Sequence, residues 1–164
     1  MMAVGVVFGI IMFIVVLCIL AFTIPAIVGQ WKVFEKAGQP GWCAVIPYYN
    51  TWKLYEISGV KPVFSLFLVG GMFCNIIGNS LSIAAQSGDS YIAAFGLVSI
   101  LFSFISIGLN ITSIVFSIKA ALNLAVYCGK EQVYGLGLAF LPFIFYPMLG
   151  FDKNVTYNKP VESK

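Results

Sequence analysis

The chain has 164 residues, of which 60% are hydrophobic and only 9% are charged, and its mean hydropathy is +0.98. A water-facing surface needs roughly a quarter charged residues, so this composition indicates a protein that faces mostly lipid. The chain has no histidine, and its nine basic residues are all lysine. It therefore lacks the usual general base and the guanidinium clamp for phosphate, and we expect no nucleic-acid partner.

The first apolar segment covers residues 3–29 and carries no charge over 27 residues. About 20 such residues cross the hydrocarbon core of a bilayer, so this segment predicts a transmembrane helix. A cleaved signal peptide is the competing interpretation. It would have a basic start and a shorter apolar stretch, and the sequence shows neither.

The connection that follows is rich in aromatic residues, and residues 38–59 predict an element that lies along the membrane surface. Residues 38–41, Gly-Gln-Pro-Gly, indicate a turn, while Pro47 and Gly59 suit the two ends of a short amphipathic helix. Amphipathic rings collect at headgroup level, where one side is apolar and the other is wet. The alternative is a soluble loop, although such loops rarely hold every tryptophan of a chain. The expected interfacial anchors are Trp42, Tyr48, Tyr49, Trp52 and Tyr55.

Two further uncharged segments, residues 63–84 and 92–118, are each long enough to span a membrane. The polar link between them is short, so they predict an antiparallel helical hairpin. The last apolar segment, residues 133–150, is barely long enough and contains Pro142 and Pro147. Proline interrupts helical hydrogen bonding, so this segment is either a kinked spanning helix, which we favour, or a re-entrant hairpin.

The predicted fold class is therefore an all-α integral membrane protein with four hydrophobic helical segments and one short interfacial helix. Residues 1–152 form a single membrane domain, and residues 153–164 form a polar tail. Lysine placement predicts the orientation, because cytoplasmic loops are enriched in lysine. With the N-terminus outside, six lysines lie inside and three lie outside. A re-entrant last segment would place all nine inside.

Small and polar residues recur at helical spacing on the second and third segments. This spacing places each set on one helix face, and such faces are the usual means of packing helices in lipid. A polar conduit is the alternative. If the hairpin turns near residue 88, residues whose numbers sum to about 176 lie at equal depth, which predicts that Asn75 bonds to Ser99 or Ser103. Asn110 then needs a partner on another helix or chain. The predicted packing seam comprises Gly71, Asn75, Gly78, Ser82, Ser99, Ser103, Ser106 and Asn110.

Catalytic chemistry finds little support in the sequence. A Ser–Lys peptidase needs a serine beside a lysine of lowered pKa, and the lysine nearest an apolar segment, Lys119, has no serine three or four residues away. We expect this intramembrane charge to extend toward the headgroups. The four cysteines stand far apart in the sequence, so we expect no metal site and no cofactor. Of the four, we expect Cys43 and Cys128 near the cytoplasmic surface.

Two motifs at opposite ends of the apolar region carry a resemblance. Residues 36–50, KAGQPGWCAVIPYYN, and residues 135–151, GLGLAFLPFIFYPMLGF, resemble a bacterial family of small uncharacterised multi-pass membrane proteins. The domain of that family is sometimes associated with, or labelled as, signal peptidase I. The family has no established activity, so the resemblance implies an architecture and a membrane setting only.

We therefore expect a non-catalytic accessory, scaffold or assembly factor of the cell membrane, with its N-terminus outside. The expected partners are the lipid bilayer and either another membrane protein or a second copy of the chain. A small-solute transporter or channel that uses the serine and asparagine residues of the third segment is the alternative. A membrane-embedded Ser/Lys enzyme is the third possibility.

Overall fold

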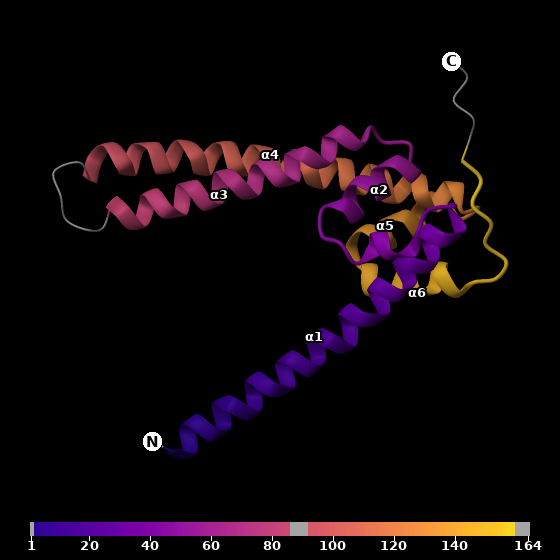
Figure 1. The fold of residues 1–164 in the computed structure, drawn as a ribbon, viewed down its shortest axis with the longest axis horizontal. Coiled ribbons are helices and arrows are strands. Elements are labelled where there is room, and N and C mark those ends of the chain that lie inside the picture. The colour runs from indigo at the N-terminus through magenta and orange to yellow at the C-terminus, as the bar shows by residue number, and fades with distance from the viewer. Residues whose placement is uncertain (1, 86–91, 160–164) are drawn as a thin grey trace.

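The computed structural model describes residues 2–85 and 92–159, and this part of the chain is helical throughout, with no strands. The helices form a compact body from which two long arms extend (Figure 1). One arm is the N-terminal part of α1, and the other is the hairpin of α3 and α4. The elements in chain order are α1 (Met2–Lys36), η1 (Gly41–Ala44), α2 (Tyr49–Ile57), η2 (Pro62–Ser65), α3 (Leu66–Ala85), α4 (Ile92–Tyr127), α5 (Gln132–Phe140) and α6 (Pro142–Phe151).

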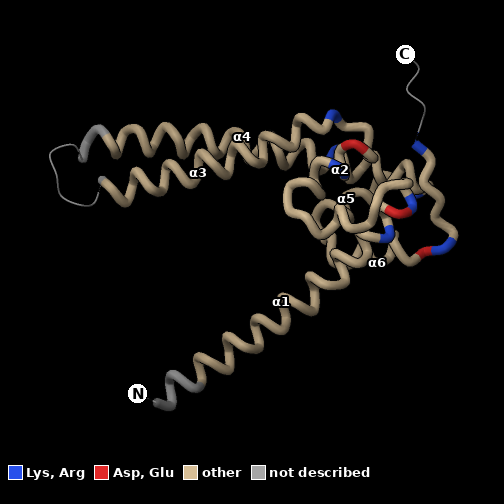
Figure 2. Tube along the Cα trace, viewed as in Figure 1, with Lys and Arg blue, Asp and Glu red and all other residues tan. Residues whose placement is uncertain are grey.

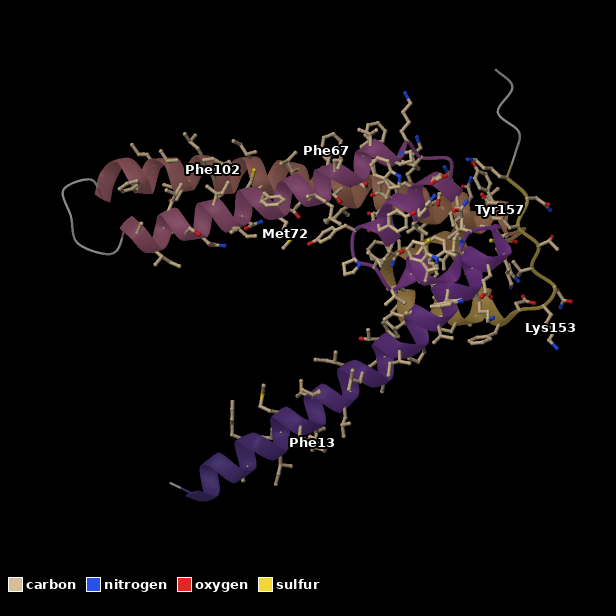
Figure 3. The ribbon with its side chains drawn as sticks, in the orientation of Figure 1. Phe13, Phe67, Met72, Phe102, Lys153 and Tyr157 are labelled. Atoms are coloured by element: carbon tan, nitrogen blue, oxygen red, sulfur yellow. The ribbon has the colours of Figure 1, made fainter. Side chains whose placement is uncertain are left out.

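Helix α1 has 35 residues, and at a rise of about 1.5 Å per residue it is roughly 52 Å long. It extends past the predicted end at residue 29, and its last two turns enter the body, where Val33 and Phe34 are buried. The large apolar side chains from Val7 to Ile24 are all exposed. This part of the helix leaves the body as a single arm, on which the Phe13 side chain extends without a neighbouring element (Figure 3).

The second arm is the antiparallel pair of α3 and α4, which lie side by side along the whole hairpin (Figure 1). Helix α4 has 36 residues and continues nine residues past the predicted end at residue 118. Its last turns lie in the body, where Ala120, Leu124 and Ala125 are fully buried. Lysine at position 119 thus ends the uncharged stretch without ending the helix.

Among the described residues, three helical segments are long and apolar enough to cross a membrane. Their ranges are Val7–Lys36, Pro62–Ala84 and Phe95–Tyr127. The predicted fourth segment differs, because it is divided at Leu141 into helices of nine and ten residues. Each is about 14 Å long, which is half of what a spanning helix needs. Neither helix is long enough to span a membrane by itself, so a fourth spanning helix is not found among the described residues.

The break at Leu141 has a local cause in the sequence. A residue before proline is disfavoured in the helical conformation, and Leu141 has φ −128° and ψ 55°. Pro142 then occupies the first turn of α6, where its missing N–H costs no helical hydrogen bond. The chain turns back at this point, so that the Tyr134 hydroxyl of α5 donates to the Phe145 carbonyl oxygen of α6 over 3.2 Å.

The two ends of this helical hairpin meet on the same side of the body. Lys130, just before α5, forms an ion pair of 2.9 Å with Asp152, just after α6. The tip of the hairpin reaches α1 through an edge-to-face contact between Phe143 and Phe22, with ring centroids 5.3 Å apart. Phe22 lies at the middle of the apolar range of α1, residues 7–36. The hairpin therefore extends along about half of the α1 span and returns.

Candidate functional site

All charged residues in the described part of the chain lie in the body, and the two arms carry none (Figure 2). Eight lysines face four carboxylates, which gives the body a net side-chain charge of +4. Positive charge gathered at one end of apolar spans is typical of a cytoplasmic face. The body is therefore the candidate site. Its charged residues are Lys32, Glu35, Lys36, Lys53, Glu56, Lys61, Lys119, Lys130, Glu131, Asp152, Lys153 and Lys159.

The core of the body is made by segments that are distant in the sequence. Helix α6 packs against the last turns of α1, and α5 packs against the last turns of α4. The hairpin of α5 and α6 thus lies between the two arms and joins them. The buried residues of this core are Val33, Phe34, Cys43, Ala44, Ile57, Ala121, Leu124, Ala125, Cys128, Leu138, Tyr146, Leu149 and Val155.

Glycine allows the closest contacts in the body. A Cβ atom on Gly29 of α1 would lie 2.3 Å from the backbone nitrogen of Pro147, and one on Gly150 would lie 2.5 Å from the carbonyl oxygen of Gly29. The backbones of α1 and α6 therefore touch, with no side chain between them. The sequence analysis missed these contacts, although Gly150 belongs to the C-terminal motif.

The two motifs that carry the resemblance meet in the body. The Lys36 ammonium group, from the first motif, donates to the carbonyl oxygens of Leu149 and Asp152 over 2.7 and 2.6 Å. These acceptors belong to the C-terminal end of α6, where carbonyl groups have no partner within the helix. Lys36 thus joins the end of α1 to the end of α6, a role that no local sequence signal indicates.

The rest of the first motif shapes the connection after α1. Gly38 has a positive φ of 71°, which glycine adopts without strain. Gly41 leaves room for the Trp31 ring, since a Cβ there would lie 2.0 Å from the indole nitrogen. The Asn50 amide donates to Gln30 of α1 and to the Ala44 carbonyl oxygen, over 2.8 and 3.2 Å. These contacts fold the connection back onto α1, in agreement with the predicted turn at residues 38–41.

The aromatic residues predicted as interfacial anchors fall into two groups. Trp42, Tyr48 and Tyr49 are exposed, and the Trp42 and Tyr49 rings are stacked with centroids 5.6 Å apart. Trp52 is half-buried. Tyr55 is fully buried, and its hydroxyl lies 2.9 Å from the Ser117 hydroxyl of α4. The anchor role predicted for Tyr55 is therefore wrong, because this side chain faces α4 and holds α2 against it.

The predicted seam residues lie along the contact between α3 and α4. The Ser106 hydroxyl donates to the Gly71 carbonyl oxygen over 3.1 Å, and the Asn75 amide donates to the Ser106 hydroxyl. A Cβ on Gly78 would lie within 3.6 Å of the Ser103 hydroxyl and of the Ser99 carbonyl oxygen. The partner of Asn75 is thus Ser106 instead of Ser99 or Ser103. Gly71 and Ser106 sum to 177, which matches the predicted register of about 176, whereas Asn75 and Ser106 sum to 181, so the Asn75 side chain reaches along the seam to Ser106.

The prediction for Asn110 is wrong, while the outer seam residues bond within their own helices. The Asn110 amide donates to the Ser106 carbonyl oxygen over 2.7 Å, and it lies against Gly71 of the neighbouring helix. Glycine at position 71 leaves space for it, so Asn110 needs no partner on another helix or chain. The Ser82 and Ser103 hydroxyls donate to carbonyl oxygens four residues earlier in α3 and α4.

We expect Gly71→Ala to leave the α3–α4 hairpin about 1 kcal/mol less stable than Gly70→Ala, because both changes gain helix propensity and only the first adds an overpacking cost. The new Cβ would lie 2.8 Å from the Asn110 amide nitrogen and would displace it from Ser106. Gly70→Ala is the matched control, because its Cβ would make only an ordinary 3.5 Å contact with Leu109. Denaturant titration in detergent checks the difference, and equal midpoints for the two variants would contradict this packing.

Lys119 and the cysteines lie as follows. Lys119 is exposed on α4, at the level where that helix enters the body. Cys43 and Cys128 are buried, and burial raises the pKa of Cys128 to about 11. Both thiols lie in the body, at the end of the molecule predicted to be cytoplasmic, but η1 and the end of α4 pack inward, so protein covers them and they are not exposed. Cys18 is exposed on the α1 arm, and Cys74 is half-buried on α3.

Many polar side chains of the body and of the α3–α4 hairpin form hydrogen bonds within the protein. In the described part of the chain, no three His, Cys, Asp or Glu side chains lie close enough to hold a metal ion. The serine hydroxyls mostly donate to backbone carbonyl oxygens, as at Ser58, Ser65 and Ser99. A pocket of about 460 Å³ forms an apolar groove between the α1 arm and Phe143.

Comparison with known proteins identifies one family. The chain matches the family of unknown function DUF5684 over residues 42–160, from within the first motif to the polar tail. No curated protein and no solved structure matches the chain. Because the match covers well over half of the sequence, the protein belongs to the DUF5684 family of unknown function.

Proposed function

We propose that the protein is a non-catalytic scaffold of the cell membrane that binds a transmembrane segment of another membrane protein along its α1 arm. It has three spanning helices and one re-entrant hairpin, with the N-terminus outside. The body and the C-terminal tail lie at the cytoplasmic surface. The exposed α1 arm is the observation that carries this proposal.

Two observations support this topology: the charge distribution, and the ion pair that joins the two ends of the α5–α6 hairpin. The end of α1, the start of α3 and the end of α4 all lie in the body, where the charged residues are found. Lys130 and Asp152 hold the start of α5 beside the end of α6, so a hairpin that enters the membrane also leaves it on the same side. Every described lysine then lies inside, as the preference for cytoplasmic lysine requires.

The α1 arm supports the scaffold role because the chain covers little of it, with Phe143 as a contact at Phe22. Helices α3 and α4 cover part of each other, whereas the most apolar stretch of α1 contains no buried residue. The arms diverge from the body (Figure 1). The connection after α1 reaches the start of the second arm, since the Tyr48 hydroxyl contacts the Met72 sulfur of α3. The exposed apolar surface of the α1 arm suits an apolar helix of another protein.

The seam geometry favours a scaffold over a conduit. Ser99, Ser106 and Ser113 are buried on α4. The hydroxyls of Ser99 and Ser106 donate to carbonyl oxygens of α4 and α3, respectively, so they do not line an open path. A peptidase role also lacks support, because Lys32, Lys53 and Lys130 bond to carboxylates and Lys36 and Lys159 bond to backbone carbonyl oxygens, and none of these bonds is to a serine hydroxyl.

Photocrosslinking in living cells tests the proposal. A photoreactive phenylalanine analogue replaces Phe13 on the α1 arm, and the matched control carries it at Phe104 on α4, since the two side chains are 65% and 69% exposed. We expect Phe13 to give one discrete adduct whose crosslinked peptide lies in a transmembrane segment of another protein, and Phe104 to give lipid adducts only. Lipid adducts alone at Phe13, or an adduct with a second copy of the chain, would contradict the proposal.

A further inference from the structure

A polar pocket of about 220 Å³ lies where α2 ends and η2 begins, on the side of the body from which α3 starts. At roughly 30 Å³ per water molecule, it has the volume of about seven waters, which is enough for a phosphate group with part of its glycerol. The pocket belongs neither to the α1 arm nor to the helical hairpin. It is lined by Glu56, Gly59, Val60, Lys61, Pro62 and Lys159.

The charge of this pocket is positive. The Glu56 carboxylate is already paired with Lys53, with a nitrogen–oxygen distance of 2.8 Å. The ammonium group of Lys159 donates to the Glu56 backbone carbonyl oxygen over 3.0 Å, and this contact leaves its charge uncompensated. Lys61, the other lysine that lines the pocket, is exposed. Two positive charges therefore remain for a ligand.

The tail that carries Lys159 is held in place over the pocket. The Tyr157 hydroxyl donates to the Ile57 carbonyl oxygen at the end of α2. The Asn158 backbone amide donates to the Tyr127 carbonyl oxygen at the end of α4, over 2.8 Å. Figure 3 shows Tyr157 turned in toward the body, while Lys153 points away from it. The position of Lys159 is thus fixed by contacts on both preceding residues.

The pocket lies at the level where a lipid phosphate group would be found. Pro62, which lines it, is also the first residue of the apolar range Pro62–Ala84. Helical backbone begins there with η2 and continues into α3, so the pocket lies where this apolar range begins. A soluble anion would gain nothing from this depth, whereas a lipid could place its acyl chains beside α3.

From these observations we infer that the pocket binds the phosphate group of an anionic phospholipid, with Lys61 and Lys159 as its charged ligands. The inference rests on the proposed cytoplasmic placement of the body. It does not depend on the scaffold role of the α1 arm. Binding to this pocket would hold the tail, the end of α2 and the start of α3 together at the membrane surface.

Native mass spectrometry of the detergent-purified protein tests this inference with phosphatidylglycerol and phosphatidylcholine as probes. A lysine near an anionic surface contributes about fivefold in affinity, so Lys61→Gln with Lys159→Gln should weaken phosphatidylglycerol binding roughly 25-fold. Lys153→Gln, which removes an exposed lysine from the same tail, is the matched control and should change it less than twofold. Lys61→Arg with Lys159→Arg should retain binding.

Three results would overturn the inference. The first is equal binding of the two lipids by the wild-type protein. The second is a loss in Lys153→Gln as large as in the double glutamine variant, since the effect would then follow overall charge. The third is displacement of phosphatidylglycerol by an equal concentration of inorganic phosphate, which would assign the pocket to a soluble anion. The melting temperature of each variant in detergent shows whether a loss of binding reflects a loss of fold. If the double glutamine variant does not fold, the double arginine variant decides: retained phosphatidylglycerol binding supports the inference, and its loss overturns it.

Discussion

Replacing Gly29 by alanine is expected to lower the free energy of unfolding of the body by 2 kcal/mol or more, within the usual range for overpacking. The added Cβ would lie 2.3 Å from the backbone nitrogen of Pro147 and 2.5 Å from the carbonyl carbon of Tyr146. Backbone atoms cannot rotate away as a side chain can, so α6 must separate from α1. The loss should appear as a lower midpoint in a denaturant titration followed by tryptophan fluorescence, since Trp31 lies on the same part of α1.

Gly9→Ala is the matched control, because it changes the same residue type on the same helix. No atom lies within 4 Å of the position that its Cβ would take. Alanine in a helix is more favourable than glycine by about 0.5–1 kcal/mol, so the control should be neutral or slightly stabilising. Equal behaviour of the two variants would show that α1 and α6 are not in backbone contact.

The second large effect is expected for Lys36→Met, which should cost about 2 kcal/mol. Hydrogen bonds from a charged group contribute about 1.5–3 kcal/mol, and Lys36 donates to two carbonyl oxygens at the end of α6. Methionine keeps the apolar length of the side chain, so the change removes the ammonium group with little loss of packing. The Leu149 carbonyl group would then lack a donor in a partly buried place, while the Asp152 carbonyl oxygen would keep only the Val155 backbone amide.

Lys32→Met is the matched control for this change. Lys32 lies one turn earlier on α1, is 46% exposed, and pairs with Glu35 over 2.7 Å in the same helix. Helical surface pairs of this kind contribute about 0.2–0.5 kcal/mol. Thermal unfolding in detergent compares the two variants, and a loss in Lys32→Met as large as in Lys36→Met would contradict the joining role of Lys36.

The long elements could be predicted because lipid imposes a strict composition on them. The uncharged runs at residues 3–29, 63–84 and 92–118 correspond to the three helices long enough to span, since a charge is costly inside a bilayer. The prediction failed at the ends of α1 and α4. There the helices continue past the lipid boundary into the body, where side chains are covered by protein. Cys128, directly after α4, is buried for this reason, whereas Cys43 is buried because η1 packs against α1.

The contacts that build the body could not be predicted, because they join residues that are far apart in the sequence. The residues next to Tyr55 in the sequence are those expected around an interfacial tyrosine. Only the packing of α2 against α4 shows that Tyr55 is a core residue. The proline after Leu141 indicated an interruption in the last segment. Whether the chain continued or turned back depended on the pairing of Lys130 with Asp152, about which the local sequence carries no information.

The central claim is that the last apolar segment enters and leaves the membrane on one side, so that the tail lies with the body. Labelling of single introduced cysteines with an impermeant maleimide tests it most directly, in intact cells and in inverted membrane vesicles. The account predicts that Lys153→Cys and Lys61→Cys react only in inverted vesicles, since both positions are exposed on the body. Asp89→Cys, in the link outside the described residues, should react in intact cells. Reaction of Lys153→Cys in intact cells, with Lys61→Cys protected there, would show that the segment crosses the membrane and would contradict the account.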